Sequence, residues 1–442
     1  MKIELVCPAA EDSAHMRSLA MAILAGLTPP DVELSFKDDI VGRLEERDLD
    51  ASVDLAAITA STKSALRAYE LADGYRRRGV KVVLGGIHPT ALPDEALEHA
   101  DAVVVGEAEG LWETLVADLR RGALQRIYRH ATLPDYRRPP RPRRDIFAAR
   151  RYVPVHTLQA SRGCPFSCEF CSVTPFFGRD FRLRDVDDVV DEIERLDRRW
   201  VMFADDNIVA HARHSRELFR ALKPLRLTWF GQASLHGLRS VENVRLMAES
   251  GCRGLFIGFE SVNAESLKGC GKLQNHPEHY REVVRILQDH GIAVWASFVF
   301  GLDEDTEDVF ERTLVFATEA RVFMALFALL TPYPGTMLFE RLRAEGRLLD
   351  ERWWLRPNRD DFPLYRPRRM SPERLYEGWQ DTWRRFYSTG AILRRFAGVS
   401  FKTAFSILSF FPLNLHQRRL TQDKILGGDK FFLRDRERSP HS

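Results

Sequence analysis

Three cysteines stand within eight residues, at Cys164, Cys168 and Cys171. Soft thiolates clustered this tightly select zinc or an iron–sulfur cluster. A structural zinc site needs a fourth Cys or His at matching spacing, but the next cysteine is Cys252, and His156 lies on the far side of the loop. Three thiolates without a fourth ligand suit a 4Fe–4S cluster in which one iron stays open to a substrate or cofactor. The pattern predicts such a cluster, with buried structural cysteines or a partial zinc site as the alternatives.

The run from Ser161 to Cys171 resembles the cluster-binding motif of the radical S-adenosylmethionine (SAM) superfamily. Phe170 stands before the third cysteine, where the family usually places an aromatic residue beside the adenine of SAM. The resemblance implies that the open iron binds the methionine amine and carboxylate of SAM. It also implies that an electron donor such as flavodoxin or ferredoxin reduces the cluster, which then splits the sulfonium to a 5′-deoxyadenosyl radical.

The overall composition says little about partners. The 442 residues are 45% hydrophobic and 29% charged, with a net charge of +2, which is typical of a protein of two or three globular domains. A charge so close to zero gives no reason to expect nucleic acid as a partner. We expect a cytoplasmic protein, because no signal peptide opens the chain, no apolar run has the ~18–20 residues of a membrane span, and the six cysteines do not suggest a disulfide framework.

Residues 1–130 alternate short β-rich runs with helical patterns, which predicts a Rossmann-like, doubly wound α/β domain. Such sheets bind ligands at the carboxyl ends of their strands. The residues at three of these ends are Ser61, Thr62, Gly85, Gly86, His88, Gly106 and Glu107. Glycines at two adjacent strand ends would let a bulky ligand approach the backbone closely.

This domain resembles the cobalamin-binding domain of a large radical SAM subclass, because of the runs at residues 85–93 and 102–107. The resemblance implies that the seven strand-end residues contact cobalamin. The Asp-x-His-x-x-Gly motif that supplies a cobalt ligand in other cobalamin proteins is absent, since His15 follows Asp12 by three residues rather than two. The resemblance therefore implies cobalamin bound without a protein histidine on cobalt. A degenerate domain that only packs on the core or binds another ligand is the alternative.

Residues 131–150 form a linker rich in proline and arginine. This composition predicts an extended, semi-rigid spacer. Its arginines are expected to face solvent, with contacts to phosphate as the alternative.

Residues 151–336 contain six β-rich runs, each followed by a helical stretch, which predicts a partial (β/α)6 barrel with its active site at the carboxyl ends of the strands. Polar residues gather at these ends, among them Asp205, Asp206, Gln232, Glu260 and Ser261. Each alone could cap a helix, and for Asp206 that alternative stays open. By resemblance, Asp205 and Asp206 stand where the family holds the methionine amino group of SAM. Gln232 and Glu260, with Ser261 beside it, stand where the family contacts the amino acid or ribose.

Residues 337–442 are predicted to form a helical C-terminal domain. The last 52 residues carry ten Lys or Arg and four Asp or Glu, and they include the apolar residues Phe401, Phe405, Leu408, Phe410 and Phe411. Such a stripe could lie on a membrane surface or cover an apolar substrate. Alternatively, it packs on its own protein.

The resemblance covers nearly the whole chain and implies a cobalamin-dependent radical SAM methyltransferase. Such an enzyme moves a methyl group from SAM through methylcobalamin to an unactivated carbon of a small biosynthetic molecule. The alternatives are ring formation or rearrangement without methyl transfer and, in another class, a non-catalytic cobalamin or redox sensor. A methylthiotransferase is disfavoured, because such enzymes typically carry three further cysteines near the N-terminus and Cys7 is the only cysteine before the motif.

Overall fold

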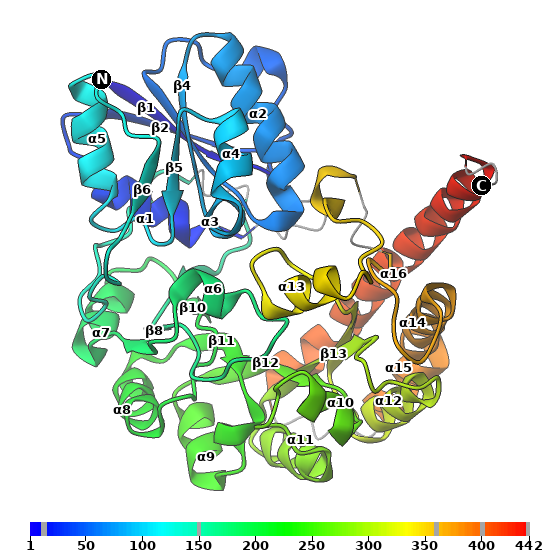
Figure 1. Cartoon of the computed structure of the whole chain (residues 1–442). Helices are drawn as coiled ribbons and strands as arrows, with labels where there is room; N and C mark the ends of the chain where they lie inside the picture. Colours follow the sequence, from blue (N-terminus) through cyan, green and yellow to red (C-terminus); the bar gives the residue numbers. More distant parts are fainter. Residues whose placement is uncertain (10–15, 148–151, 358–361, 398–402, 439–442) are drawn as a thin grey trace.

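The computed structural model describes residues 1–9, 16–147, 152–357, 362–397 and 403–438, with side chains described up to Gln422 except that of Ala404. Asp12, His15 and Phe401, named above, lie outside the described residues. Two six-stranded parallel sheets follow one another along the chain, and helices make up most of the C-terminal part (Figure 1). The expected α/β fold class is therefore confirmed.

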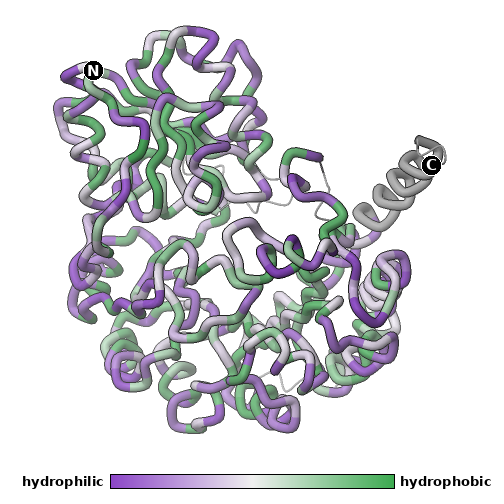
Figure 2. Tube along the Cα trace, in the orientation of Figure 1, coloured by the Kyte–Doolittle hydropathy of each residue, from purple (hydrophilic) through white to green (hydrophobic). Residues whose placement is uncertain are grey.

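The N-terminal sheet has the strand order β2–β1–β3–β4–β5–β6, and all its pairs are parallel. Its strands are β1 (Lys2–Cys7), β2 (Glu33–Asp38), β3 (Leu55–Thr59), β4 (Lys81–Gly85), β5 (Ala102–Val105) and β6 (Ile127–Arg129). One face packs on α1 (Leu19–Leu27) and α5 (Trp112–Arg120), the other on α2 (Ala65–Arg77) and α4 (Pro93–His99). Figure 2 shows hydrophobic residues gathered along these central strands. The strand order reverses between β1 and β3, where doubly wound sheets form a ligand crevice.

The second sheet is the partial barrel, with the order β7–β10–β11–β12–β13–β14 and parallel pairs throughout. Its strands are β7 (His156–Leu158), β10 (Trp200–Phe203), β11 (Thr228–Ala233), β12 (Cys252–Glu260), β13 (Ala293–Phe300) and β14 (Met324–Leu329). The outer helices are α7 (Val186–Glu194), α8 (Ala212–Leu222), α9 (Val241–Glu249), α11 (Tyr280–Asp289) and α12 (Asp308–Glu319). Since β7 and β14 do not pair with each other, the barrel is open along one side.

The C-terminal helices are α13 (Met337–Ala344), α14 (Pro372–Phe386), α15 (Thr389–Phe396) and α16 (Ala404–Arg438). Most of the aromatic residues in this part pack on the protein itself. The indoles of Trp379 and Trp383 on α14 both donate to the carbonyl of Phe327 on β14, each at 2.8 Å. The far end of α16 extends away from the rest of the molecule (Figure 1).

A second aromatic contact ties the C-terminal part to the N-terminal sheet. Trp354 donates from Nε1 to the Glu95 carboxylate of α4 at 2.9 Å, and Arg352 pairs with the same carboxylate at 2.9 Å. The Glu95 carboxylate also forms hydrogen bonds with the Tyr69 hydroxyl at 3.0 Å and with His88 Nε2 at 3.1 Å. Burial opposes ionisation of Glu95, but the hydrogen bonds from His88, Trp354 and Tyr69 lower its pKa to about 2. The carboxylate is thus a charged, fully partnered anchor between two parts of the chain.

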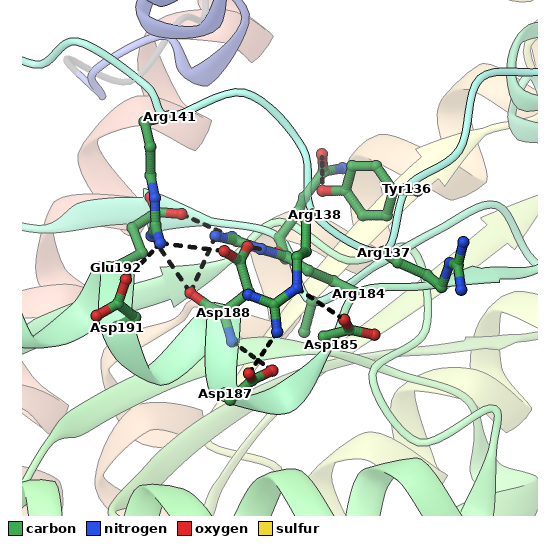
Figure 3. A network of polar contacts seen from close by, with 12 residues as sticks. Tyr136, Arg137, Arg138, Arg141, Arg184, Asp185, Asp187, Asp188, Asp191 and Glu192 are labelled. Carbon is green, nitrogen blue, oxygen red and sulfur yellow. Dashed lines mark hydrogen bonds and ion pairs between the residues drawn. The ribbon is translucent and has the colours of Figure 1, made fainter.

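The described part of the linker, residues 131–147, contains no helix or strand and includes a turn at residues 145–146. Its arginines are not simply solvated, however, because they run along the acidic helix α7 (Figure 3). Arg138 pairs with Asp185 and Asp187 in exposed contacts. Such pairs contribute little to stability.

Two further linker arginines reach buried carboxylates of the same helix. Arg141 contacts Asp188 at 3.1 Å, and Arg144 contacts Glu192 at 2.6 Å. Arg184, which precedes α7, pairs with both of these carboxylates from within the protein (Figure 3). Because a buried charge that loses its partner is costly, these pairs fix the path of the linker against the barrel.

Candidate active site

The three motif cysteines lie in one loop at the carboxyl end of the first barrel strand. The short antiparallel pair β8 (Ser161–Arg162) and β9 (Arg182–Leu183) frames this loop, which also contains α6 (Val173–Phe177). Gly163 opens the loop at a φ of 83°, and a Cβ there would approach the carbonyl oxygen of Asp180 to 3.0 Å. Glycine is therefore required at this position.

The three thiols are free and partly or fully buried. Burial raises the pKa of each, that of Cys171 to about 11. Metal binding removes these protons. Among the described side chains, no group of three or more His, Cys, Asp and Glu surrounds a point that could hold one metal ion. A 4Fe–4S cluster bonds each thiolate to a different iron, so its three ligands need not converge on one point.

A buried lysine that the sequence analysis missed lies beside the cysteine loop. Lys272 donates to the Glu260 carboxylate at 2.8 Å, and Gln274 points its amide at the Cys168 sulfur, 3.9 Å away. Burial opposes the charge of Lys272, but Glu260 and Cys168 together keep its pKa above the ordinary value. A fixed cation suits the negative charge that a thiolate-bound cluster brings. Its only signal in the sequence is the run Cys270-Gly271-Lys272, which resembles no ligand motif.

Glu260 adopts a left-handed backbone conformation, with a φ of 63°. Such a conformation costs a non-glycine residue free energy and is common at functional sites. The carboxylate occupies the position that a Cβ on Gly258 would take. This explains the glycine two residues earlier and leaves Glu260 aimed at Lys272.

The two adjacent aspartates predicted to bind SAM have different surroundings. Asp205 is fully buried and accepts from the backbone N–H of Ala160 at 3.0 Å and the Ser161 hydroxyl at 2.5 Å, so it fixes the strand that leads into the cysteine loop. Burial raises its pKa to about 7. Asp206 keeps a buried oxygen, Oδ2, without a hydrogen-bond partner, and burial raises its pKa to about 6. A carboxylate with an unused oxygen near Cys164 fits the ammonium group of SAM.

Of the other residues predicted to contact SAM, one has an exposed side chain and two contact the protein itself. Gln232 is exposed on the inner side of β11. The Ser261 hydroxyl accepts from the N–H of Asn263 at 3.1 Å and thus closes a local turn. Phe170 packs against the apolar cluster that contains Leu302 and Leu342.

A cavity with about 970 Å³ of empty space, its open mouth included, lies between the carboxyl edge of the N-terminal sheet and the cysteine loop. Four of the residues predicted to contact cobalamin line it, namely Gly85, Gly86, Gly106 and Glu107. The side chains of α1 and the rings of Phe176 and Phe177 provide apolar walls that the sequence analysis missed. A Cβ on Gly106 would meet nothing within 4 Å. The cavity therefore has room for a bulky ligand at this strand end.

Three other residues predicted to contact cobalamin do not line this cavity. The hydroxyl of Ser61 accepts from the N–H of Ser64, and Thr62 is buried in the same short turn. His88 is fully buried in the Glu95 contact described above. Sequence position placed all three at strand ends, but Thr62 and His88 are buried in the protein, and the exposed Ser61 uses its hydroxyl to close the turn.

One wall of the cavity is a buried ion network that joins the N-terminal sheet to the cysteine loop. Glu107, at the end of β5, pairs with Arg162 of β8 and with Arg182 of β9. Arg162 also contacts Glu109 at 2.6 Å and stacks over the ring of Tyr136, with its guanidinium carbon 4.3 Å from the ring centroid. Both ends of the cysteine loop are thereby bound to the N-terminal domain.

The comparisons with known proteins agree with this geometry. A model of the radical SAM superfamily matches residues 158–317, and a model of the B12 binding domain matches residues 16–116. A domain of unknown function, DUF4070, matches residues 336–406.

Two curated relatives come from Chlorobaculum tepidum. Bacteriochlorophyllide d C-12(1)-methyltransferase is 32% identical over 94% of this chain and 92% of its own length. Bacteriochlorophyllide d C-8(2)-methyltransferase is 30% identical over 78% of this chain and 80% of its own. The solved structure of the radical SAM methyltransferase TsrM from Kitasatospora setae, with cobalamin and a [4Fe-4S] cluster bound, has the same fold at 18% identity, with a TM-score of 0.67 over 96% of this chain and 99% of that one.

The chain belongs to the family of cobalamin-dependent radical SAM methyltransferases. The expected cofactors, a 4Fe–4S cluster, SAM and cobalamin, are confirmed by these matches.

Replacing any one motif cysteine with alanine should abolish cluster loading. After anaerobic reconstitution, the wild type should hold about four iron atoms per chain and each variant close to none. Iron and sulfide analysis measures this directly. Cys270→Ala is the matched control, because Cys270 is buried nearby but lies outside the motif. A Cys164→Ala protein that keeps its full iron content would contradict the assignment.

The variant Glu107→Gln should loosen the cysteine loop, because it removes the carboxylate that the two buried guanidinium groups of Arg162 and Arg182 share and leaves Glu109 as an ion-pair partner of Arg162 alone. Backbone amides between residues 163 and 181 should exchange hydrogen at least about tenfold faster than in the wild type. Mass spectrometry of peptic fragments gives the rates. The control Glu113→Gln, on the exposed surface of α5, should leave the exchange rates of this loop unchanged. Exchange rates in the Glu107 variant that equal those of the wild type would show that the network does not hold the loop.

Proposed function

We propose that this enzyme methylates a saturated carbon on the periphery of a tetrapyrrole, a large, flat and mostly apolar molecule. Two observations support the proposal. Two of the relatives that match this chain at 30% identity or more are bacteriochlorophyllide d methyltransferases. The lumen of the barrel is also lined mainly by apolar and aromatic side chains.

The alternation of side chains along each strand identifies the lumen residues. On β14, Phe327 packs outward against Trp383 of α14, so Leu326 points inward. On β13, Phe298 packs outward against α12, and Trp295 points inward. The same alternation on β10, β11 and β12 gives the remaining members of the wall.

The inward residues of β10 to β14 include Met202, Phe230, Phe256, Trp295, Val299, Met324 and Leu326. The rings of Phe230 and Trp295 stack with their centroids 5.9 Å apart, so two aromatic rings form one part of this wall. Phe405 of α16 packs on Phe230 and closes the amino-terminal end of the barrel. Leu326 is 42% exposed although it lies within a strand, so the lumen has open space beside it. A planar apolar substrate fits these walls.

The chain's own residues then have separate roles in the proposed reaction. The cluster and SAM, when bound, supply a radical that removes a substrate hydrogen, and cobalamin carries the methyl group. Asp206 receives the SAM ammonium group, and the Lys272–Glu260 pair fixes charge beside the cysteines. The apolar walls of the cavity and the lumen exclude water. The proposal includes a cytoplasmic location and reduction by a flavodoxin or ferredoxin.

Anaerobic turnover tests the methyl-transfer reaction. With the cluster reconstituted, and with cobalamin, SAM, a low-potential reductant and a bacteriochlorophyllide-type substrate present, S-adenosylhomocysteine and 5′-deoxyadenosine should both appear. Mass spectrometry quantifies the two products. Formation of S-adenosylhomocysteine should depend on cobalamin. Deoxyadenosine alone would instead indicate rearrangement or ring formation. If a loaded enzyme formed neither of the two products, the proposal would be contradicted.

The substrate assignment is tested by filling the lumen. Leu326→Trp should weaken binding of the tetrapyrrole at least about tenfold, because the indole takes the space of the substrate. Val315→Trp is the control, since Val315 has nearly the same exposure, 40%, on the outer helix α12. Pigment absorbance during titration reports binding. Retained cobalamin and SAM binding in both variants shows that the fold is intact, and an unchanged affinity in Leu326→Trp would exclude the lumen as the site.

A further inference from the structure

The outward face of α16 is apolar although it is exposed. Leu408, Pro412 and Leu415 follow one another at spacings of four and three residues, which places them on one side of the helix. All three are exposed, and Leu408 is 75% exposed, the largest fraction among the large hydrophobic residues described. Arg419 continues the same stripe by one turn. An apolar stripe that ends in a cation is unlike an ordinary solvated helix surface.

The orientation of this stripe is fixed by a buried arginine on α15. Arg395 is fully buried and donates to the side-chain oxygen of Asn414 at 3.0 Å and to the carbonyl of Phe323 at 3.2 Å. Asn414 in turn donates to Phe323 at 3.1 Å, and Phe410 is buried on the same side of α16. Because these contacts hold one side of α16 against the barrel, Leu408 and Leu415 must face outward.

Helix α15 extends the same surface. The rings of Phe396 on α15 and Phe411 on α16 have centroids only 4.4 Å apart. Leu393, one turn before Phe396, is 53% exposed, and Arg394 beside it is exposed as well. We call Leu393, Arg394, Leu408, Pro412, Leu415 and Arg419 the C-terminal surface.

The chain segment that carries the C-terminal surface has charged residues of one sign, although Arg395 is buried and Arg385 pairs with Glu311. The sequence contains no Asp or Glu between Asp381 and Asp423. The same stretch contains the cationic residues Arg384, Arg385, Arg394, Arg395, Lys402, Arg418 and Arg419. The chain as a whole carries a net charge of only +2, so this concentration is local.

We propose that the C-terminal surface docks the enzyme on an anionic lipid membrane. Exposed leucines enter the boundary between head groups and acyl chains, while the neighbouring arginines pair with lipid phosphates. The contact is peripheral, because no helix in the described part of the chain is long and apolar enough to cross a membrane. A second copy of the chain is a poorer occupant, since a two-fold interface would bring identical arginines together.

Co-sedimentation of the full chain with lipid vesicles tests this proposal. The wild type should bind vesicles of phosphatidylcholine mixed with phosphatidylglycerol and should bind vesicles of phosphatidylcholine alone much more weakly. Leu408→Asp should reduce binding to the anionic vesicles at least about tenfold, and the double variant Arg394→Gln/Arg419→Gln should reduce it to a similar degree. High salt should weaken binding of the wild type.

Val241→Asp is the matched control, because Val241 is a 53% exposed apolar residue on α9, outside the C-terminal surface. It should bind anionic vesicles as the wild type does. Wild-type protein that does not bind anionic vesicles would overturn the proposal, as would equal losses in Leu408→Asp and Val241→Asp. A dimer seen by light scattering that Leu408→Asp dissociates, without vesicle binding, would assign the surface to a second copy. Cluster loading and cobalamin binding do not involve this surface, so these outcomes are independent of the methyltransferase proposal.

Discussion

The buried pairing of Glu107 with Arg162 and Arg182 is the interaction on which the arrangement of the site depends. Each arginine stands at one end of the cysteine loop, and the carboxylate stands at the end of a strand of the other domain. Ions removed from water are tolerated only where their partners are in place. The cost of separating these charges therefore holds the cluster-binding loop against the cavity wall. The linker arginines on α7 add a second connection on the outer side of the barrel.

Buried charged groups near this network have different roles that depend on their hydrogen-bond partners. Asp205 and Asp206 are neighbours in sequence, yet one is saturated by backbone and hydroxyl donors and the other keeps an unused oxygen. Lys272 stays charged within the protein because the Glu260 carboxylate lies 2.8 Å away. Glu260 has a left-handed backbone conformation, which is costly for a residue other than glycine and is common at functional sites. The site thus combines fixed charges near the cysteines with apolar walls around the larger cavities.

The sequence predicted the features that repeat or have strict spacing. The cysteine motif, the alternation of strands and helices and the polar residues after barrel strands are local patterns, and the loop, both sheets and the placement of Asp206 followed from them. Contacts between distant segments left no such pattern. Lys272 reaches the cysteine loop through the folding of the barrel itself, while the pairing of Arg162 with Glu107 and the docking of the linker on α7 depend on how the domains meet. His88 shows the converse limit, since a residue at a strand end can turn its side chain into the protein.

The contact between Trp354 and Glu95 has a consequence for how the enzyme can move. It joins the C-terminal part to α4 on one side of the molecule, while Glu107 and the arginines join the cysteine loop to β5. Two separate attachments allow less relative rotation than a single hinge would. The width of the cavity between the N-terminal sheet and the cysteine loop is therefore set by the packing of the whole protein. Large molecules then enter the site through openings that the folded protein already has. The shape of those openings limits which molecules the enzyme can bind.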